Sequence, residues 1–278
     1  MNYGRKQTKR KIKAVNSKSQ KYFNKVGISF FKACFVFILF AIVTGVGAGI
    51  GAYRGILDSA PELNPESVAP SGFITTIYDS KGNPVETLVG AGANRIEATY
   101  DELPQDLIDA FVAIEDSRFW SHSGIDLRSI TRAAVGVLTN DYAGGGSTIT
   151  QQLAKNLYFT QEKELTRKAA EVFMAFELER NYSKEEILEL YVNSIYFGDG
   201  YYDVASASEG YFGKTPEELN DYEATLLAGV PNAPSVYAPT KNPDKAEQRR
   251  LQVVNRMIAC GYITVAESET YAALAADY

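Results

Sequence analysis

The pattern of apolar and charged positions sets one stretch near the start of the chain apart from the rest. Residues 33–53 form a run of 21 residues without a charge. A helix rises ~1.5 Å per residue, so a helix of this length spans a hydrocarbon core of ~30 Å. A cleaved signal peptide is the alternative, but its apolar region is usually ~7–15 residues long. We therefore predict an uncleaved transmembrane helix at residues 33–53.

After this run the pattern changes twice. Residues 54–72 are predicted to be a linker, because most of them are proline, serine, glutamate or other turn formers. Residues 73–89 alternate around a Lys-Gly-Asn turn, which predicts a short β-hairpin. Beyond the hairpin, helical periodicity, good helix formers and capping residues dominate. The segments expected to be helical are 103–116, 125–140, 144–157, 164–181, 182–198, 215–230 and 244–261, followed by a short terminal helix.

Several of these helices carry start and stop signals. Thr148 with Gln151, and Ser183 with Glu186, have the spacing of a capping box. Glycines at 198 and 261 are expected to end two helices. Residues 73–278 are therefore predicted to form one mostly α domain with a single hairpin.

The distribution of charge agrees with a membrane anchor. Residues 1–57 contain eleven Lys and Arg and no Asp or Glu, so they carry +11, whereas residues 58–278 carry −17. Such asymmetry suggests a membrane or nucleic-acid contact at the basic end. Beside an apolar helix, the positive-inside rule places residues 1–32 in the cytoplasm as a basic tail and the domain 73–278 outside. Cys34 and Cys260 are too far apart in this arrangement for a disulfide.

The first candidate site is EDSRFWSHSGID, residues 115–126, which holds the only tryptophan and the only histidine. Glu115 ends an apolar helix, and burial in a cleft would make such a glutamate a usable base. An exposed glutamate is the equal alternative. A zinc site built on histidine is not expected, because no His-Glu-x-x-His pattern is possible. We interpret His122 as a structural residue, and Phe119 and Trp120 as packing residues.

The second candidate is GGGSTITQQLAKN, residues 144–156. A glycine loop before a helix start leaves free N–H groups that bind anions. Gln152, Lys155 and Asn156 recur on one helix face, and Lys155 offers a positive charge to a phosphate. The Gly-Lys-Ser/Thr ending of a Walker loop is missing. The alternative is a mobile surface loop followed by an ordinary capped helix.

The third candidate is RKAAE, in which Arg167 and Glu171 lie four residues apart on one helix face. The simplest interpretation is a surface ion pair, worth a few tenths of a kcal/mol. The functional interpretation is a second carboxylate beside cations that hold a pyrophosphate. Taken together, the three stretches fit transfer from a phosphorylated lipid donor.

Five blocks of the chain, in order, closely resemble the peptidoglycan glycosyltransferase family, the transglycosylase module of class A penicillin-binding proteins. They are EDSRFWSHSGID, GGGSTITQQLAKN, RKAAEVFMAFELER, and the blocks that begin ILELYVNS and LLAGVPNAPS, and they span roughly residues 72–260. The resemblance implies a lysozyme-like α fold in which one subregion, called the jaw, lies in the membrane. It also implies lipid II as the substrate and glycan-strand polymerisation as the reaction.

The same resemblance implies roles for single residues. Glu115 would be the catalytic base and Glu171 a second essential carboxylate. Asp203 departs from the pattern, because many members have glycine there. The implied substrate-binding residues are Ser147, Thr148, Gln152, Lys155, Asn156, Arg167 and Lys168.

The implied reaction inverts the anomeric carbon and releases undecaprenyl pyrophosphate, with Glu115 as base and Lys155 and Arg167 stabilising the leaving charge. No cofactor is required and no metal site is expected from the residues, although Mg²⁺ or Mn²⁺ at the pyrophosphate is compatible with this chemistry. The expected partners are lipid II, the growing glycan strand and the lipid bilayer, with other cell-wall synthesis proteins as candidates and no nucleic acid. The expected location is the bacterial cell membrane, crossed once.

Two other functions compete with this one. A membrane-anchored lytic muramidase with a lysozyme-like fold would also use one glutamate, but it would not need the cations or the second glutamate block. A non-catalytic membrane scaffold is the third possibility. Experiment distinguishes the three functions. A glycosyltransferase makes polymer, a lytic enzyme releases short soluble products, and a scaffold is indifferent to the loss of Glu115.

Two further expectations concern the rest of the chain. Leu127, Ile130, Val137 and Leu138 are expected to touch the membrane, with filling of the core as the alternative. The sequence is also expected to lack a penicillin-sensitive transpeptidase, because its only Ser-x-x-Lys begins at Ser29, at the cytoplasmic edge of the membrane helix. It is therefore interpreted as monofunctional, unless it is the front part of a longer protein.

Overall fold

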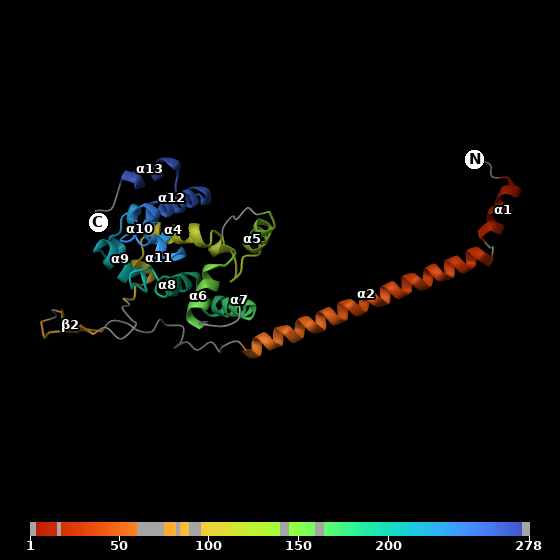
Figure 1. Cartoon of the computed structure of the whole chain (residues 1–278), viewed down its shortest axis with the longest axis horizontal. Coiled ribbons are helices and arrows are strands. Elements are labelled where there is room, and N and C mark those ends of the chain that lie inside the picture. Colours follow the sequence, from red (N-terminus) through yellow and green to blue (C-terminus); the bar gives the residue numbers. More distant parts are fainter. Residues whose placement is uncertain are drawn as a thin grey trace. The chain divides into compact units, whose positions relative to one another are not determined.

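The computed structural model describes residues 4–15, 18–59, 75–81, 84–88, 96–139, 145–158 and 164–273. The chain divides into two compact units, Met1–Ser59 and Ala60–Tyr278. The described residues of the first unit form two helices, α1 (Arg5–Val15) and α2 (Lys18–Ser59), drawn in red and orange in Figure 1.

The predicted apolar segment 33–53 lies wholly within α2. The stretch Lys25–Gly47 of this helix is long and apolar enough to cross a membrane, with a mean hydropathy of 2.5. The most apolar part of this stretch is not buried in protein, and Phe37, for example, is 72% exposed. A core helix of a soluble protein would bury such side chains. The exposed apolar surface therefore favours a membrane span.

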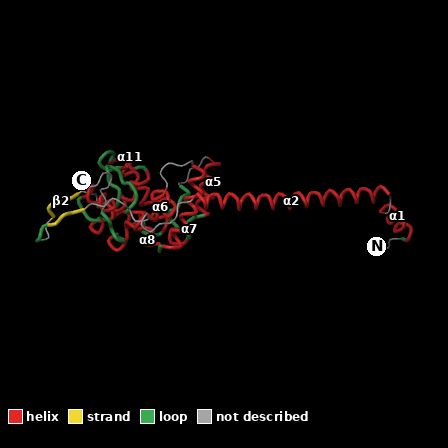
Figure 2. The backbone as a smooth tube through the Cα atoms, turned by 90° about the horizontal axis from the view of Figure 1, so that it is seen from below, coloured by secondary structure: helices red, strands yellow, loops and turns green. Residues whose placement is uncertain are grey.

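The first described element of the second unit is the predicted β-hairpin, which the structure confirms. β1 (Thr75–Tyr78) pairs with β2 (Pro84–Leu88) in antiparallel register, and Figure 2 shows both strands in yellow. Proline is tolerated at the first position of β2, where no ladder hydrogen bond depends on its missing N–H. The remainder of the predicted turn and the linker residues 60–72 lie outside the described residues. The prediction of a linker was wrong for residues 54–59, because α2 continues without a break to Ser59.

The other described elements of the second unit are helices, as the sequence predicted. Short 3₁₀ turns at Tyr100–Glu102, Phe119–Ser121, Pro216–Glu218 and Val230–Asn232 connect the helices. The helices are α4 (Gln105–Glu115), α5 (Leu127–Thr139), α6 (Ile149–Tyr158), α7 (Glu164–Asn181), α8 (Lys184–Val192), α9 (Val204–Phe212), α10 (Asp221–Gly229), α11 (Pro234–Tyr237), α12 (Pro243–Cys260) and α13 (Val265–Ala273).

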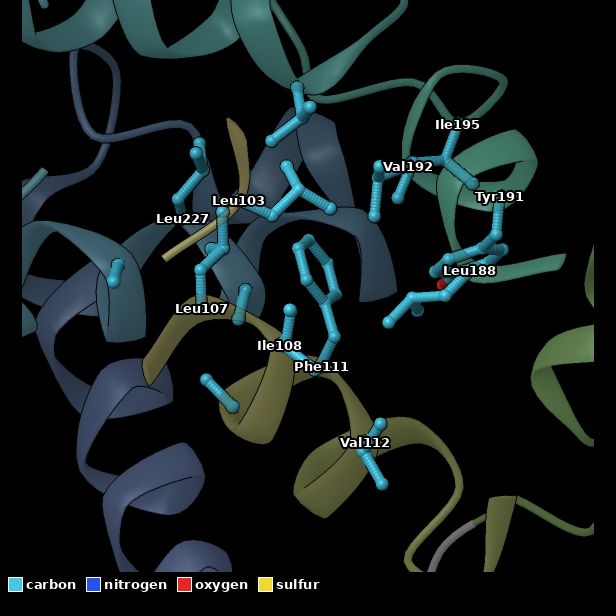
Figure 3. Packing of buried hydrophobic residues seen from close by; sticks show 14 of the residues in the cluster. Leu103, Leu107, Ile108, Phe111, Val112, Leu188, Tyr191, Val192, Ile195 and Leu227 are labelled. Carbon is cyan, nitrogen blue, oxygen red and sulfur yellow. The ribbon is translucent and has the colours of Figure 1, made fainter. Parts of the chain in front are cut away.

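The hydrophobic core is built around α4. This helix buries a nearly continuous apolar run from Leu107 to Ala113, as expected for a helix surrounded by others. It packs against α10 and α12, which lie beside it in Figure 1. Figure 3 shows Phe111 among the side chains of α8, including Val192. Since Glu115 is the last residue of α4, the core fixes the position of its backbone.

Two predicted helix boundaries were wrong. α8 ends at Val192, six residues before Gly198, and its C-cap side chain, Asn193, accepts a hydrogen bond from Ala98 N and donates one to Ala98 O. This pairing spans 95 residues of sequence and is invisible in local periodicity. The segment 215–230 is also not one helix. Its first turn is 3₁₀, and α10 starts afresh after Asn220, whose side chain caps Glu223 N.

Other boundary predictions are confirmed. α7 covers the whole of the predicted segment 164–181, and α12 ends before Gly261, which adopts φ +80°. The capping boxes at Thr148 and Ser183 both form. Asp203, the departure from the family pattern, is the buried N-cap of α9 and accepts hydrogen bonds from the backbone and hydroxyl of Ser206.

Candidate active site

Glu115 lies in a cleft, so the alternative of an exposed glutamate was wrong. Its side chain is only 12% exposed. Oε2 accepts a hydrogen bond from Gln152 Nε2 at 2.9 Å. Oε1 is buried and has no hydrogen-bond donor among the residues that the structure describes. The guanidinium of Arg249 approaches Oε1 to 3.7 Å, which offsets part of the cost of burying a negative charge.

The neighbouring Asp116 ties the Glu115 turn to α6. Its Oδ2 accepts a hydrogen bond from Ile149 N, the first residue of α6, at 3.1 Å, and pairs with His122 Nε2 at 2.8 Å. A carboxylate at a helix N-terminus is favourably placed in the field of the helix. His122 therefore has the structural role that the sequence suggested.

Asp126 joins the same turn to α5. It accepts hydrogen bonds from Arg118, from the backbone of Arg128 and from the hydroxyl of Ser129. Burial opposes ionisation, but the bonds from Arg118 and Ser129 outweigh it and hold the pKa of the Asp126 carboxyl well below its usual range. The turn that follows Glu115 is thus fixed to α5 by one end and to α6 by the other.

The glycine-loop helix contributes residues in two different ways. Gln152 points toward Glu115, while Lys155 and Asn156 are exposed. Thr148 is buried, and its hydroxyl donates to Gly124 O at 2.6 Å. Gly124 itself adopts φ +88° and lies so close to Ala175 O that a Cβ would clash. The hydroxyl of Thr148 is therefore used by the fold rather than being open to a ligand.

The ion pair on α7 is not a surface pair. The Glu171 side chain is 1% exposed, with Oε1 2.6 Å from Arg167 Nη1 and Oε2 2.8 Å from Lys168 Nζ. Lys168 also donates to Ser147 Oγ at 2.6 Å. Arg167 and Lys168 themselves remain partly exposed. One buried carboxylate therefore holds two cations that solvent can still reach.

Two cavities meet at Glu115. A cavity of about 360 Å³ collects most of the predicted site residues. Asn156 lines neither cavity, and Thr148 lines only the second, of about 590 Å³. Glu115, Ser147, Gln152 and Asn232 border both. The remaining lining residues of the smaller cavity are Gln151, Lys155, Arg167, Lys168, Glu171 and Pro231.

The larger cavity is lined by cations that the sequence analysis missed. Arg132 comes from α5, while Arg249 and Arg256 come from one face of α12 together with Gln252 and Asn255. The only sequence signal for Arg249 and Arg256 is the spacing of polar residues in RRLQVVNR, which is equally typical of a solvated helix face. Their approach to Glu115 depends on the packing of α12 against α4.

Tyr191 on α8 was also missed. It is fully buried, and its hydroxyl donates to Gln152 Oε1 at 3.3 Å. Burial, with the charges of Glu115 and Asp116 next in size, raises the pKa of Tyr191 well above its ordinary value. Hydrogen bonds therefore run from Tyr191 through Gln152 to Glu115.

Comparison with known proteins places the chain in a family. Residues 81–258, well over half of the chain, match the family model described as Transglycosylase. The chain belongs to the transglycosylase family. This confirms the resemblance inferred from the five sequence blocks and the mostly helical fold expected from it.

The curated relatives are penicillin-binding proteins. Penicillin-binding protein 1A of Aquifex aeolicus is 47% identical over 79% of this chain and 30% of its own length. Penicillin-binding protein 1A of Escherichia coli is 40% identical over 85% of this chain and 28% of its own length. A crystal structure of penicillin-binding protein 1A from Haemophilus influenzae covers 73% of this chain and 20% of that one, at 26% identity and a TM-score of 0.41. The chain thus spans about a third of the length of its curated relatives.

Proposed function

We propose that the chain is a peptidoglycan glycosyltransferase that polymerises lipid II into glycan strands. The observation that carries this proposal is the position of Glu115 between two cavities that are both lined by cations. Joining two sugars that each bear a pyrophosphate requires an anion site on either side of the base. Hydrolysis of an uncharged glycan would require neither, which is the reason for preferring synthesis over lysis.

Glu115 Oε1 is the atom assigned to accept the proton. It is buried without a hydrogen-bond donor among the described residues, whereas Oε2 is held by Gln152. A sugar hydroxyl in the larger cavity donates to Oε1 and loses its proton as its oxygen bonds to the anomeric carbon of the donor. The bond from that carbon to the pyrophosphate breaks with inversion, and its electron pair leaves on undecaprenyl pyrophosphate.

The smaller cavity is assigned to the leaving pyrophosphate. Lys155, Arg167 and Lys168 line it, and fixed cations stabilise negative charge that grows in the transition state. Glu171 is assigned to hold two of these cations, since each of its oxygens already accepts a bond from one of them. In this proposal it acts on the reaction through them.

The residues of the smaller cavity do not fit a metal held by the protein. Both oxygens of Glu171 are within hydrogen-bond distance of a cation, and no group of three His, Cys, Asp or Glu gathers within the described part of the chain. A divalent ion would have to arrive with the pyrophosphate itself. The proposed steps use only the side chains named above.

Membrane attachment completes the proposal. α2 crosses the bilayer once, with the basic residues before it on the cytoplasmic side and the catalytic unit outside. The first residues of α5 carry apolar side chains exposed to solvent, led by Leu127 at 67% exposure. Contact of α5 with the bilayer would bring the cavities close to a lipid-linked substrate.

The test is incubation of the detergent-solubilised chain with labelled lipid II, followed by separation of the products. We expect a ladder of long glycan strands that lysozyme digests. Release of short soluble products from purified glycan, without polymer from lipid II, would instead support the lytic alternative.

A further inference from the structure

Tyr191 lines neither cavity, yet it is connected to the base through one side chain. We propose that Tyr191 is a positioning residue, whose hydroxyl fixes the Gln152 amide with its NH2 group toward Glu115. The inference rests on the proposed function and adds a residue to that site. Its basis is the hydrogen-bond chain in which Tyr191 Oη lies 3.3 Å from Gln152 Oε1, and Gln152 Nε2 lies 2.9 Å from Glu115 Oε2.

The direction of the chain follows from the donors available. The raised pKa of Tyr191, caused by burial and by the nearby carboxylates, keeps its hydroxyl protonated at neutral pH. A protonated hydroxyl donates to Gln152 Oε1, which leaves Nε2 to donate to Glu115. If the amide were turned over, its carbonyl oxygen would face a carboxylate oxygen, and two acceptors would be in contact without a hydrogen.

The tyrosine is itself held in place by the core. Its ring meets the edge of Phe111 at a centroid distance of 6.1 Å and an interplanar angle of 89°. Phe111 lies four residues before Glu115 on α4, so it is on the same face of that helix. Tyr191 therefore sets the position of an α6 amide relative to an α4 carboxylate from a third helix, α8.

The test is a double-mutant cycle with Tyr191→Phe and Gln152→Met, both close in shape to the parent residues. Without the hydroxyl, the Gln152 amide can rotate away from Glu115, so Tyr191→Phe should lower kcat about tenfold and leave KM unchanged. The effects of the two substitutions on kcat should not multiply. The double variant should have the same kcat as Gln152→Met alone, because the tyrosine acts only through the glutamine.

Tyr211→Phe is the matched control. Its hydroxyl is also buried, but it donates to Phe197 O at 2.8 Å, away from Glu115. This variant should lose stability to a similar extent and keep the parent kcat. An unchanged kcat in Tyr191→Phe, or effects that multiply in the double variant, would overturn the inference.

A second readout is independent of activity. The same cycle measured by urea unfolding should give a non-zero coupling between Tyr191 and Gln152, and zero coupling would overturn the inference even if kcat changed. If the parent chain makes no polymer, the proposed function fails, and the unfolding cycle still decides whether Tyr191 holds Gln152.

Discussion

The two oxygens of the Glu115 carboxylate have different surroundings. Oε2 accepts a hydrogen bond from Gln152, while Oε1 is buried and has no hydrogen-bond donor among the described residues. Arg249, at 3.7 Å, is close enough to attract Oε1 but too distant for a hydrogen bond. Arg249 is itself held by Gln252 Oε1 at 2.9 Å. This geometry suits a base, because one oxygen orients the group and the other is left for the proton.

Substitutions of the cations that line the smaller cavity should have two kinds of effect. Lys155 is exposed, so Lys155→Ala should reduce polymerisation strongly while the unfolding free energy changes little. Arg167→Ala should reduce polymerisation and also destabilise the fold by about 1–3 kcal/mol, because it removes one partner of the buried Glu171. Initial rates on lipid II and urea unfolding measure the two effects. A parent rate in either variant would mean that the pyrophosphate site is misplaced.

The stability of the catalytic unit should depend on pH through Asp221. Burial, followed by the neighbouring Asp106 carboxyl, raises the pKa of Asp221 above its ordinary value. The folded chain then keeps a proton that the unfolded chain releases, so this group lowers stability as the pH rises from the unfolded pKa through the folded pKa.

Asp221→Asn should remove the loss of stability that deprotonation of Asp221 causes as the pH rises. Relative to the parent, the variant should gain unfolding free energy between about pH 4 and neutral pH, the window that starts at the ordinary Asp pKa. Urea unfolding at a series of pH values is the measurement. Parent and variant curves that run parallel over this range would contradict the assignment.

The candidate site could be predicted only where its residues are close in sequence. Lys155, Arg167, Lys168 and Glu171 lie within two short blocks, and the structure brings them into one cavity. Arg249, by contrast, reaches Glu115 across more than a hundred residues of sequence, and the polar spacing of RRLQVVNR around it is equally typical of a solvated helix face. Charge on a helix face shows which residues are polar, and only the packing of α12 shows what they face.

At the scale of elements, α5 presents an apolar surface to solvent. Leu127, Ile130 and Val135 are 67%, 39% and 51% exposed, so Leu127 and Ile130 do not fill the core, which was the alternative. The side chains of Val137 and Leu138, named with them in the prediction, lie outside the described residues. An exposed apolar helix face beside the cavity fits contact with a bilayer.

This surface should bind membranes without α2. A chain lacking residues 1–57 should still sediment with liposomes, and replacing Leu127 and Val135 with serine should abolish that binding at unchanged stability. The matched control is Leu251→Ser, since Leu251 is 46% exposed on α12. Full retention of the truncated chain in the supernatant would count against the membrane contact.

The presence of the helices could be predicted from the sequence, but some of their ends could not. The helical period and good helix formers indicated the helices, and local caps such as Ser183 with Glu186 fixed the starts. The end of α8 falls at Asn193, whose side chain bonds to Ala98, a residue that only the folded chain brings near. Boundaries set by local hydrogen bonds can be predicted from sequence, whereas boundaries set by distant partners cannot.

At the scale of the whole molecule, the matched family region and the candidate membrane helix belong to separate compact units. The chain spans about a third of the length of its penicillin-binding relatives. The absence of covalent labelling of these 278 residues by a fluorescent penicillin stays a prediction, based on the position of the only Ser-x-x-Lys at Ser29.

The most direct test of the central claim is the initial rate of glycan polymerisation from labelled lipid II by Glu115→Gln and by the parent. The amide keeps the shape of the side chain but cannot take the proton, so the rate should fall by about 10²–10⁴-fold with the unfolding curve unchanged. Glu177→Gln is the control, because Glu177 pairs with Arg180 on α7 and lines neither cavity. Its rate should equal that of the parent. Polymerisation by Glu115→Gln at a rate close to the parent's would contradict the assignment of Glu115 as the base.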